Sequence, residues 1–149
     1  MFDGKKVLVT GGAGFLGSDI AGKLLAEGAL VVVIDNLFRG KLSNLQTFVG
    51  NSNFTFIEGD VCAESDLLNC ESIHSGFDVI YHLAAVNGTK WFHEEARNVI
   101  ENNIVGTLRT LESAQRCGAR YVLASSPEAF GDSKQQPLSD GNPMVFSNP

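Results

Sequence analysis

Short, nearly continuous apolar runs recur along the chain, separated by longer stretches of mixed polarity. The run Ala29–Asp35 reads Ala-Leu-Val-Val-Val-Ile-Asp, almost without a polar residue. Strands buried on both faces of a parallel sheet look like this, whereas half-exposed antiparallel strands alternate. The runs that we expect to form strands are Lys5–Thr10, Ala29–Asp35, Phe54–Glu58, Val79–Leu83 and Arg120–Ala124.

Between these runs the apolar positions recur at helical spacing, which predicts helices over Gly14–Glu27, roughly Ala63–Cys70, and Glu94–Arg116. Gly118 is expected to end the last helix in a left-handed cap. The residues that share one stripe of that helix are Ala96, Ile100, Ile104, Leu108 and Leu111. Strands alternating with helices predict right-handed βαβ units, and therefore an α/β, Rossmann-like doubly wound parallel sheet of about five strands.

The pattern dissolves between Gly131 and Pro149 into Asp, Ser, Gln, Gly, Asn and Pro. A loop of this length usually connects to another element. We therefore expect one domain over residues 1–149, in which residues 130–149 form a loop leading to a missing C-terminal portion.

The net charge of the chain excludes some classes of binding partner. Eleven Lys and Arg against 17 Asp and Glu leave a formal charge of −6, which argues against nucleic acid and anionic membranes. No apolar run reaches the ~18 residues of a membrane span, and none near Met1 has the length of a secretory signal. Cys62, Cys70 and Cys117 are irregularly spaced, which is typical of small apolar residues in a reducing cytosol rather than of disulfides or a metal site. The expected location is cytoplasmic.

A glycine-rich segment joins the first predicted strand to the first predicted helix. It reads Thr10-Gly11-Gly12-Ala13-Gly14-Phe15-Leu16-Gly17. Glycines at 11, 14 and 17 allow a sharp turn, a close approach of backbone to a pyrophosphate, and tight packing of helix on strand. The helix N-terminus adds free N–H groups. In this context the segment predicts a dinucleotide site, and the alternative is a purely structural turn.

Asp35 supports the same interpretation independently. It ends the second predicted strand, where a carboxylate can bind both hydroxyls of an adenosine ribose. A 2′-phosphate would meet like charge there, so we expect NAD rather than NADP. Arg39 and Lys41 weaken this preference, because either could neutralise the phosphate. The alternative role of Asp35 is to cap a turn.

With these residues the chain resembles the extended short-chain dehydrogenase/reductases, especially the nucleotide-sugar epimerases and dehydratases, whose glycines have the same spacing. The resemblance runs the full chain and implies NAD as the cofactor. The residues that it adds to the three glycines and Asp35 as cofactor-binding are Phe15, Leu16, Asn36, Asp60, Val61, Leu83, Ala84, Ala85, Lys90 and Asn103.

Three motifs carry this part of the resemblance. Gly59-Asp60-Val61 is similar to the family's third-strand end, where the Asp approaches the adenine, and His82-Leu83-Ala84-Ala85 to the fourth-strand end that lines the cofactor. Asn103 with Gly106-Thr107 resembles a helix motif whose Asn stabilises the sheet and a proton relay. Without the resemblance, Asp60 would be a turn residue, His82 a satisfied buried histidine and Asn103 a helix-surface residue. Thr89 and Lys90 lie on the substrate side, or in a solvated loop.

The segment after the fifth strand, residues 124–131, holds the candidate catalytic residues. The resemblance implies that Ser126 hydrogen-bonds the reacting hydroxyl, orienting it and stabilising charge on its oxygen. The alternative is a strand-end serine that satisfies a local backbone group. Glu128 stands where dehydratases carry an acidic residue. Those enzymes usually have Asp at position 127, so Pro127 counts against dehydration.

The family's general base is the Tyr of a Tyr-x-x-x-Lys pair, which by the resemblance would lie just past Pro149. Tyr81 and Tyr121 lie in predicted strands, and neither has Lys four residues on. We expect a truncated chain, inactive alone: the cofactor half of an NAD-dependent nucleotide-sugar epimerase that works through a transient keto sugar. The alternatives are a dehydratase, decarboxylase or reductase of the same family, and a non-catalytic NAD-binding module.

The expected partners are a nucleotide-sugar substrate, bound together with the missing lobe, and a second copy of the chain. Relatives often dimerise through a bundle of two helices from each subunit. The Glu94–Arg116 helix is a candidate for that bundle, but its Leu108–Leu111 stripe is equally compatible with packing on the sheet.

Overall fold

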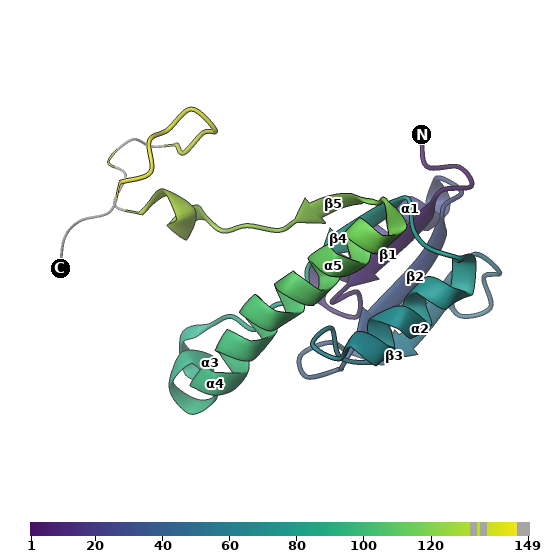
Figure 1. Cartoon of the computed structure of the whole chain (residues 1–149), viewed down its shortest axis with the longest axis horizontal. Helices are drawn as coiled ribbons and strands as arrows, with labels where there is room; N and C mark the ends of the chain where they lie inside the picture. Colours follow the sequence, from purple (N-terminus) through teal and green to yellow (C-terminus); the bar gives the residue numbers. More distant parts are fainter. Residues whose placement is uncertain (132–133, 135–136, 146–149) are drawn as a thin grey trace.

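The computed structural model describes residues 1–131, 134 and 137–145. One sheet of five parallel strands, in the order β3-β2-β1-β4-β5, forms its centre (Figure 1). The strands are β1 (Lys6–Thr10), β2 (Leu30–Asp35), β3 (Phe54–Glu58), β4 (Val79–His82) and β5 (Arg120–Leu123). The predicted Rossmann-like α/β fold is thus confirmed. The strand order reverses between β1 and β4, and such sheets bind ligands at the carboxyl ends of the strands at that point.

Helices cover both faces of the sheet. On one face lie α1 (Phe15–Ala26) and the 3₁₀ segment η1 (Leu42–Phe48), and on the other lie α2 (Glu64–His74) and α5 (Thr107–Cys117). Helix α2 continues past its predicted end at Cys70, and Ser75 ends it in the left-handed conformation. The fold is therefore doubly wound, with three layers.

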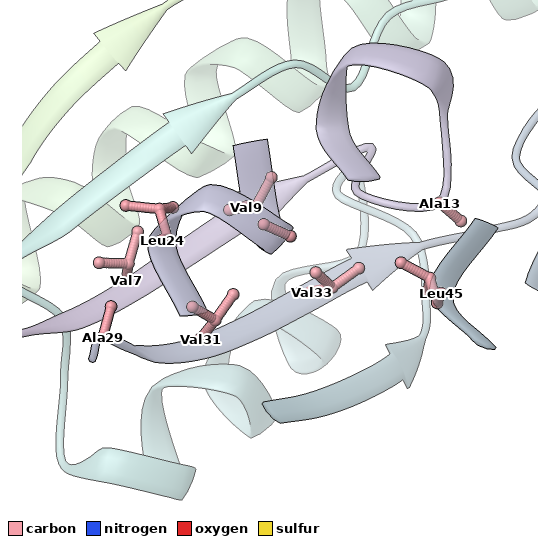
Figure 2. Packing of buried hydrophobic residues seen from close by; sticks show 9 residues of the cluster. Val7, Val9, Ala13, Leu24, Ala29, Val31, Val33 and Leu45 are labelled. Atoms are coloured by element: carbon pink, nitrogen blue, oxygen red, sulfur yellow. The ribbon is translucent and has the colours of Figure 1, made fainter. Parts of the chain in front are cut away.

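The core consists of two buried clusters separated by the sheet. Strands β1 and β2 contribute alternate residues to each, so both are buried on two faces, as their unbroken apolar sequence predicts. Figure 2 shows the cluster beneath α1, which includes Val7, Val9, Leu24, Val31, Val33 and Leu45. The cluster beneath α2 and α5 includes Leu8, Val32, Ile34, Leu67, Cys70, Ile80 and Ala114.

The single helix predicted over Glu94–Arg116 is wrong in its first part. A short helix, α3 (Thr89–Glu94), ends in a break at Glu95, where φ is −135° and ψ is 37°. Glu94 is the last residue of that earlier helix, where its carboxylate lies 3.7 Å from the Lys90 ammonium one turn back. Helical backbone then runs without interruption through α4 (Ala96–Ile100), the π-helical segment η2 (Glu101–Gly106) and α5. Gly118 ends it with φ 64°, which confirms the predicted left-handed cap.

The apolar stripe of this long helix faces away from the sheet, which decides between the two orientations that the sequence leaves open. Ile100, Ile104, Leu108 and Leu111 are 59%, 56%, 55% and 48% exposed. The side that packs inward is small or polar, and consists of Val99, Gly106, Thr110, Ser113 and Ala114.

The buried polar groups of that inward side are paired. The Thr110 hydroxyl is 2.8 Å from the Tyr121 hydroxyl, and the Ser113 hydroxyl donates to Glu71 at 2.7 Å. Close packing also restricts Gly106, because a Cβ there would lie 2.8 Å from Cγ2 of Val61. The helix therefore docks on the sheet through small residues and hydrogen bonds and leaves its large apolar residues outside.

Beyond β5 the chain leaves the sheet (Figure 1). It forms the 3₁₀ turn η3 (Pro127–Phe130), and an isolated bridge pairs Gly131 with Val145. Of the loop expected over residues 130–149, positions 132–133, 135–136 and 146–149 lie outside the described residues.

Candidate cofactor-binding site

The glycine segment occupies the carboxyl end of β1, as predicted. Gly11 has φ +67°, and a Cβ there would lie 2.8 Å from the Ala84 Cα, so the backbones of β1 and the β4 loop touch directly. A Cβ on Gly17 would lie 2.3 Å from the Gly11 carbonyl oxygen. Only glycine fits either place. The fold itself therefore requires these two residues, for the turn and for packing α1 on β1.

The third glycine borders an open helix end. Gly14 caps α1 with no side-chain hydrogen bond, and a Cβ there would approach only the Gly11 oxygen, at 3.1 Å. The first N–H groups of a helix have no partner within it. Phe15 and Leu16, which carry two of them, are 87% and 61% exposed. This end of α1 can therefore receive an anion such as a pyrophosphate.

Asp35 ties the end of β2 to the glycine segment. Its carboxylate is buried and accepts the Ala13 N–H at 3.0 Å and the Leu37 N–H at 2.8 Å. Asp35 therefore caps a turn, which was the alternative role that the sequence suggested for it. Each carboxylate oxygen keeps further acceptor capacity, so capping leaves it able to bind a ribose hydroxyl.

Two further glycines shape this corner, and the sequence analysis did not single them out. A Cβ on Gly12 would lie 2.5 Å from Val33, and one on Gly40 would lie 2.7 Å from Asp35 Oδ1. The backbone of Gly40 therefore packs directly against the Asp35 carboxylate. Its requirement arises from a contact between two loops, so spacing along the chain does not reveal it.

The loops after β3 and β4 complete the edge of the sheet. Asp60 Oδ1 accepts the Cys62 N–H at 2.8 Å, which makes Asp60 a turn cap, and Val61 is buried in the core. The N–H groups of Leu83 and Ala84 both donate to Thr10 Oγ1 at 3.2 Å. The predicted residues of these loops are thus brought to the same edge as the glycine segment.

His82 is the centre of a buried hydrogen-bond chain. Because Thr10 Oγ1 accepts two N–H groups, its own proton is directed to His82 Nδ1, 2.8 Å away. Nε2 then carries the imidazole proton and donates to Thr107 Oγ1 at 3.2 Å, and Thr107 donates to the Asn103 carbonyl at 2.7 Å. Burial lowers the pKa of His82 to about 4. The imidazole is therefore neutral and uses both nitrogens.

Asn103 supports the β4 loop rather than lying free on the helix surface. Its side chain accepts the Val86 N–H at 2.8 Å and donates to the Val86 carbonyl at 2.9 Å. Both amide groups are thus committed to one backbone unit. Asn103 and His82 together hold the loop after β4 to the long helix, and sequence reasoning missed their partners Thr10 and Val86.

The remaining candidates lie at the periphery. Lys90 is exposed, 3.7 Å from Glu94, with its ammonium 4.8 Å from the centre of the Trp91 ring. Ser126 and Glu128 are exposed beyond β5, and among the described residues neither side chain has a hydrogen-bond partner. Ser126 lines a hollow with Phe130, Leu138 and Met144. In Figure 1 the chain that carries this hollow extends away from the sheet.

Cysteine and metal chemistry find no support in the described part of the chain. Burial raises the pKa of the Cys62 thiol to about 11 and that of Cys70 to about 12, which disfavours the nucleophilic thiolate. No cluster of three His, Cys, Asp or Glu side chains suited to a metal ion occurs among residues 1–131, 134 and 137–145. Over the same residues, no helix has the length and apolar character needed to cross a membrane.

Comparison with known proteins agrees with this geometry. A family model described as the NAD dependent epimerase/dehydratase family matches residues 7–149. The chain belongs to this family. Its members are NAD dependent by that description, which confirms NAD as the cofactor and the resemblance noted from the motifs.

Curated relatives include UDP-glucuronic acid decarboxylase 1 of Xenopus tropicalis, which is 38% identical over 93% of this chain and 31% of its own. UDP-glucuronic acid decarboxylase 2 of Arabidopsis thaliana is 40% identical over 90% of this chain and 28% of its own. An epimerase from Methanothermobacter thermautotrophicus superposes with a TM-score of 0.86 at 32% identity, over 98% of this chain and 42% of that one. The chain thus spans about a third of the length of these curated relatives.

The buried imidazole predicts a dependence of stability on pH. Because the pKa of His82 is about 4 in the folded chain and 6.5 in the unfolded chain, the unfolded state takes up the proton first as pH falls. The contribution of the neutral His82 to the free energy of unfolding is therefore complete above pH 6.5. It is lost as the pH falls from 6.5 to 4, by up to about 3 kcal/mol. We expect the free energy of unfolding, measured with denaturant at several pH values in this range, to change less steeply with pH for His82→Gln than for wild type.

His74 needs a separate variant, because burial lowers its pKa too. His74→Gln therefore measures how much His74 contributes to the pH dependence of the unfolding free energy. Wild type and the two variants have the same carboxylates, whose contribution cancels when the proteins are compared. Identical slopes for wild type and His82→Gln would contradict the neutral buried imidazole.

Proposed function

We propose that this chain binds NAD along the carboxyl ends of β2, β1 and β4. The adenosine ribose would hydrogen-bond Asp35, and the pyrophosphate would accept N–H groups at the start of α1. The observation that carries this proposal is the hydrogen bond from the Ala13 N–H to Asp35, because it holds a carboxylate beside an open helix end.

Other residues would line or support the same path. Those after β3 would meet the adenine, and those after β4 the nicotinamide half. Asn103 would act through Val86, since its amide is already committed there. The proposed set, besides Asp35, is Gly11, Gly14, Phe15, Leu16, Gly17, Asn36, Asp60, Val61, Leu83, Ala84, Ala85, Lys90 and Asn103.

Replacing Asp35 by Asn is expected to weaken NAD binding about tenfold or more, because hydrogen bonds to a charged acceptor contribute about 1.5–3 kcal/mol. Calorimetry measures the dissociation constant. Asp78→Asn is the matched control, since Asp78 also accepts a backbone N–H, from Lys6, but at the opposite ends of the strands. Equal affinities of wild type and Asp35→Asn for NAD would contradict the proposed site.

The reaction that we propose begins with oxidation of a hydroxyl on a nucleotide sugar. NAD⁺, when bound, supplies an acceptor for the hydride of that carbon. Ser126 would hydrogen-bond the hydroxyl and stabilise the charge that develops on its oxygen. Glu128 would serve as an acid or base on the sugar beside it. The general base for the hydroxyl proton would come from the remainder of a longer protein, so the chain would not turn over alone.

For the outcome we propose decarboxylation of a UDP-sugar acid, because relatives at 37–40% identity are named UDP-glucuronic acid decarboxylases. Oxidation at C4 of such a sugar produces a β-keto acid. The C5–C6 bond then breaks, CO₂ leaves, and the electron pair passes into the C4 carbonyl as an enolate. Protonation at C5 and return of the hydride to C4 complete the balance.

Epimerisation, the first interpretation from the sequence, is the second candidate, and the similar solved structure named an epimerase favours it. The same oxidation would occur, but the hydride would return to the opposite face of the keto sugar. The NAD site and Ser126 would serve both outcomes.

Product analysis separates these candidates. The longer protein, incubated with UDP-glucuronic acid, is expected to release CO₂ and a UDP-pentose, and Ser126→Ala should lower kcat about a hundredfold. An epimer with no CO₂ would favour the second candidate. NAD binding with no reaction of either UDP-glucuronic acid or UDP-glucose would indicate a non-catalytic NAD-binding module.

We also propose that the exposed stripe of Ile100, Ile104, Leu108 and Leu111 packs against a second copy of the chain. Four large apolar side chains about half exposed on one helix face are typical of an interaction surface. Sedimentation velocity is expected to find a dimer that Leu108→Glu dissociates. A monomer at all concentrations would contradict the homodimer.

A further inference from the structure

Two loops that follow strands β2 and β4, which do not pair with each other, meet at the carboxyl end of β1. One is residues 36–41, after β2, and the other is residues 83–88, between β4 and α3. Strand β1 lies between β2 and β4 in the sheet. The Arg39 guanidinium nevertheless donates from one Nη to the Asn87 carbonyl at 2.8 Å and to the Asn87 side-chain oxygen. The ring of Phe38, in the first loop, lies 4.8 Å from the ring of Trp91, in α3 just after the second loop.

Both ends of this connection are held in place from below. On the β2 side, Asp35 accepts the Leu37 N–H, and Asn36 accepts the Phe38 N–H at 3.1 Å. On the β4 side, the Asn103 amide holds both backbone groups of the buried Val86, the residue before Asn87. Although Arg39 and Asn87 are exposed, their backbones are thus pre-positioned, which reduces the entropy lost in joining the side chains.

The connection decides what Arg39 can do for a cofactor. Arg39 follows Asp35 closely, and an arginine in this region is the group that accommodates the 2′-phosphate of NADP. Here its guanidinium donates to Asn87, in the loop after β4, on the other side of β1 from Asp35. With Arg39 bonded to Asn87, a 2′-phosphate at Asp35 meets the like charge of the carboxylate without the counter-charge of this guanidinium.

We propose that Asn87 is a cofactor-specificity residue, which favours NAD over NADP by holding Arg39 away from the 2′-position of the adenosine ribose. The inference rests on the proposed NAD site. The preference for NAD over NADP then depends on a residue after β4, although residues at the end of β2 usually determine it.

A double-mutant cycle tests it, with the ratio of the dissociation constants of NADP and NAD as the readout. In wild type, Arg39→Ala should leave the ratio unchanged within about twofold, because Arg39 does not serve the phosphate. Asn87→Ala removes the side-chain acceptor and leaves the carbonyl, so it should lower the ratio about threefold, as the guanidinium is freer to pair with the 2′-phosphate. Arg39→Ala in the Asn87→Ala background should restore it.

The ratio separates specificity from general damage, because a distorted site would weaken both nucleotides together. Lys41→Ala in the Asn87→Ala background is the control for the neighbouring cation, and should leave the lowered ratio in place. An unchanged ratio in Asn87→Ala, or a rise in the ratio on Arg39→Ala that is the same in both backgrounds, would overturn the inference. If folded wild type binds neither nucleotide, the proposed NAD site itself fails.

Discussion

The close approach of bare backbone at the carboxyl end of β1 is the constraint on which the site depends. Gly11 lies against Ala84, and Gly17 lies against the Gly11 carbonyl, with no room for a Cβ at either glycine. This contact fixes where α1 begins, so its open N–H groups lie at the edge of the sheet. Asp35, bonded to Ala13, then places a carboxylate beside them. A helix end that favours anions and a carboxylate that suits ribose hydroxyls match the two halves of an adenosine diphosphate.

Hydrogen bonds rather than apolar contacts hold the other side of this edge. His82 joins Thr10 of β1 to Thr107 of the long helix, and Asn103 fixes the loop after β4. Each group in the chain of bonds has its partner, so the network is buried without leaving an unpaired group in the core. The long helix consequently docks through polar and small residues, and its large apolar stripe remains outside.

The sequence predicted the strands and the glycine segment well, because unbroken apolar runs and glycine spacing are local signals. The break at Glu95 and the π-helical segment were missed, since apolar positions at helical spacing continue through both and carry no signal for either. Motif resemblance, not periodicity, drew attention to Asn103. The Arg39–Asn87 connection joins residues far apart in the chain through exposed polar side chains, and no pattern of spacing encodes such a contact.

The central claim is that NAD lies along the start of α1 and the end of β2. The most direct measurement is an amide NMR titration of the isotope-labelled chain with NAD. The largest shifts are expected at Phe15, Leu16 and Gly17 and in residues 35–39, with little change in α2. Saturable binding whose shifts cluster elsewhere, or no shift at the start of α1, would contradict it.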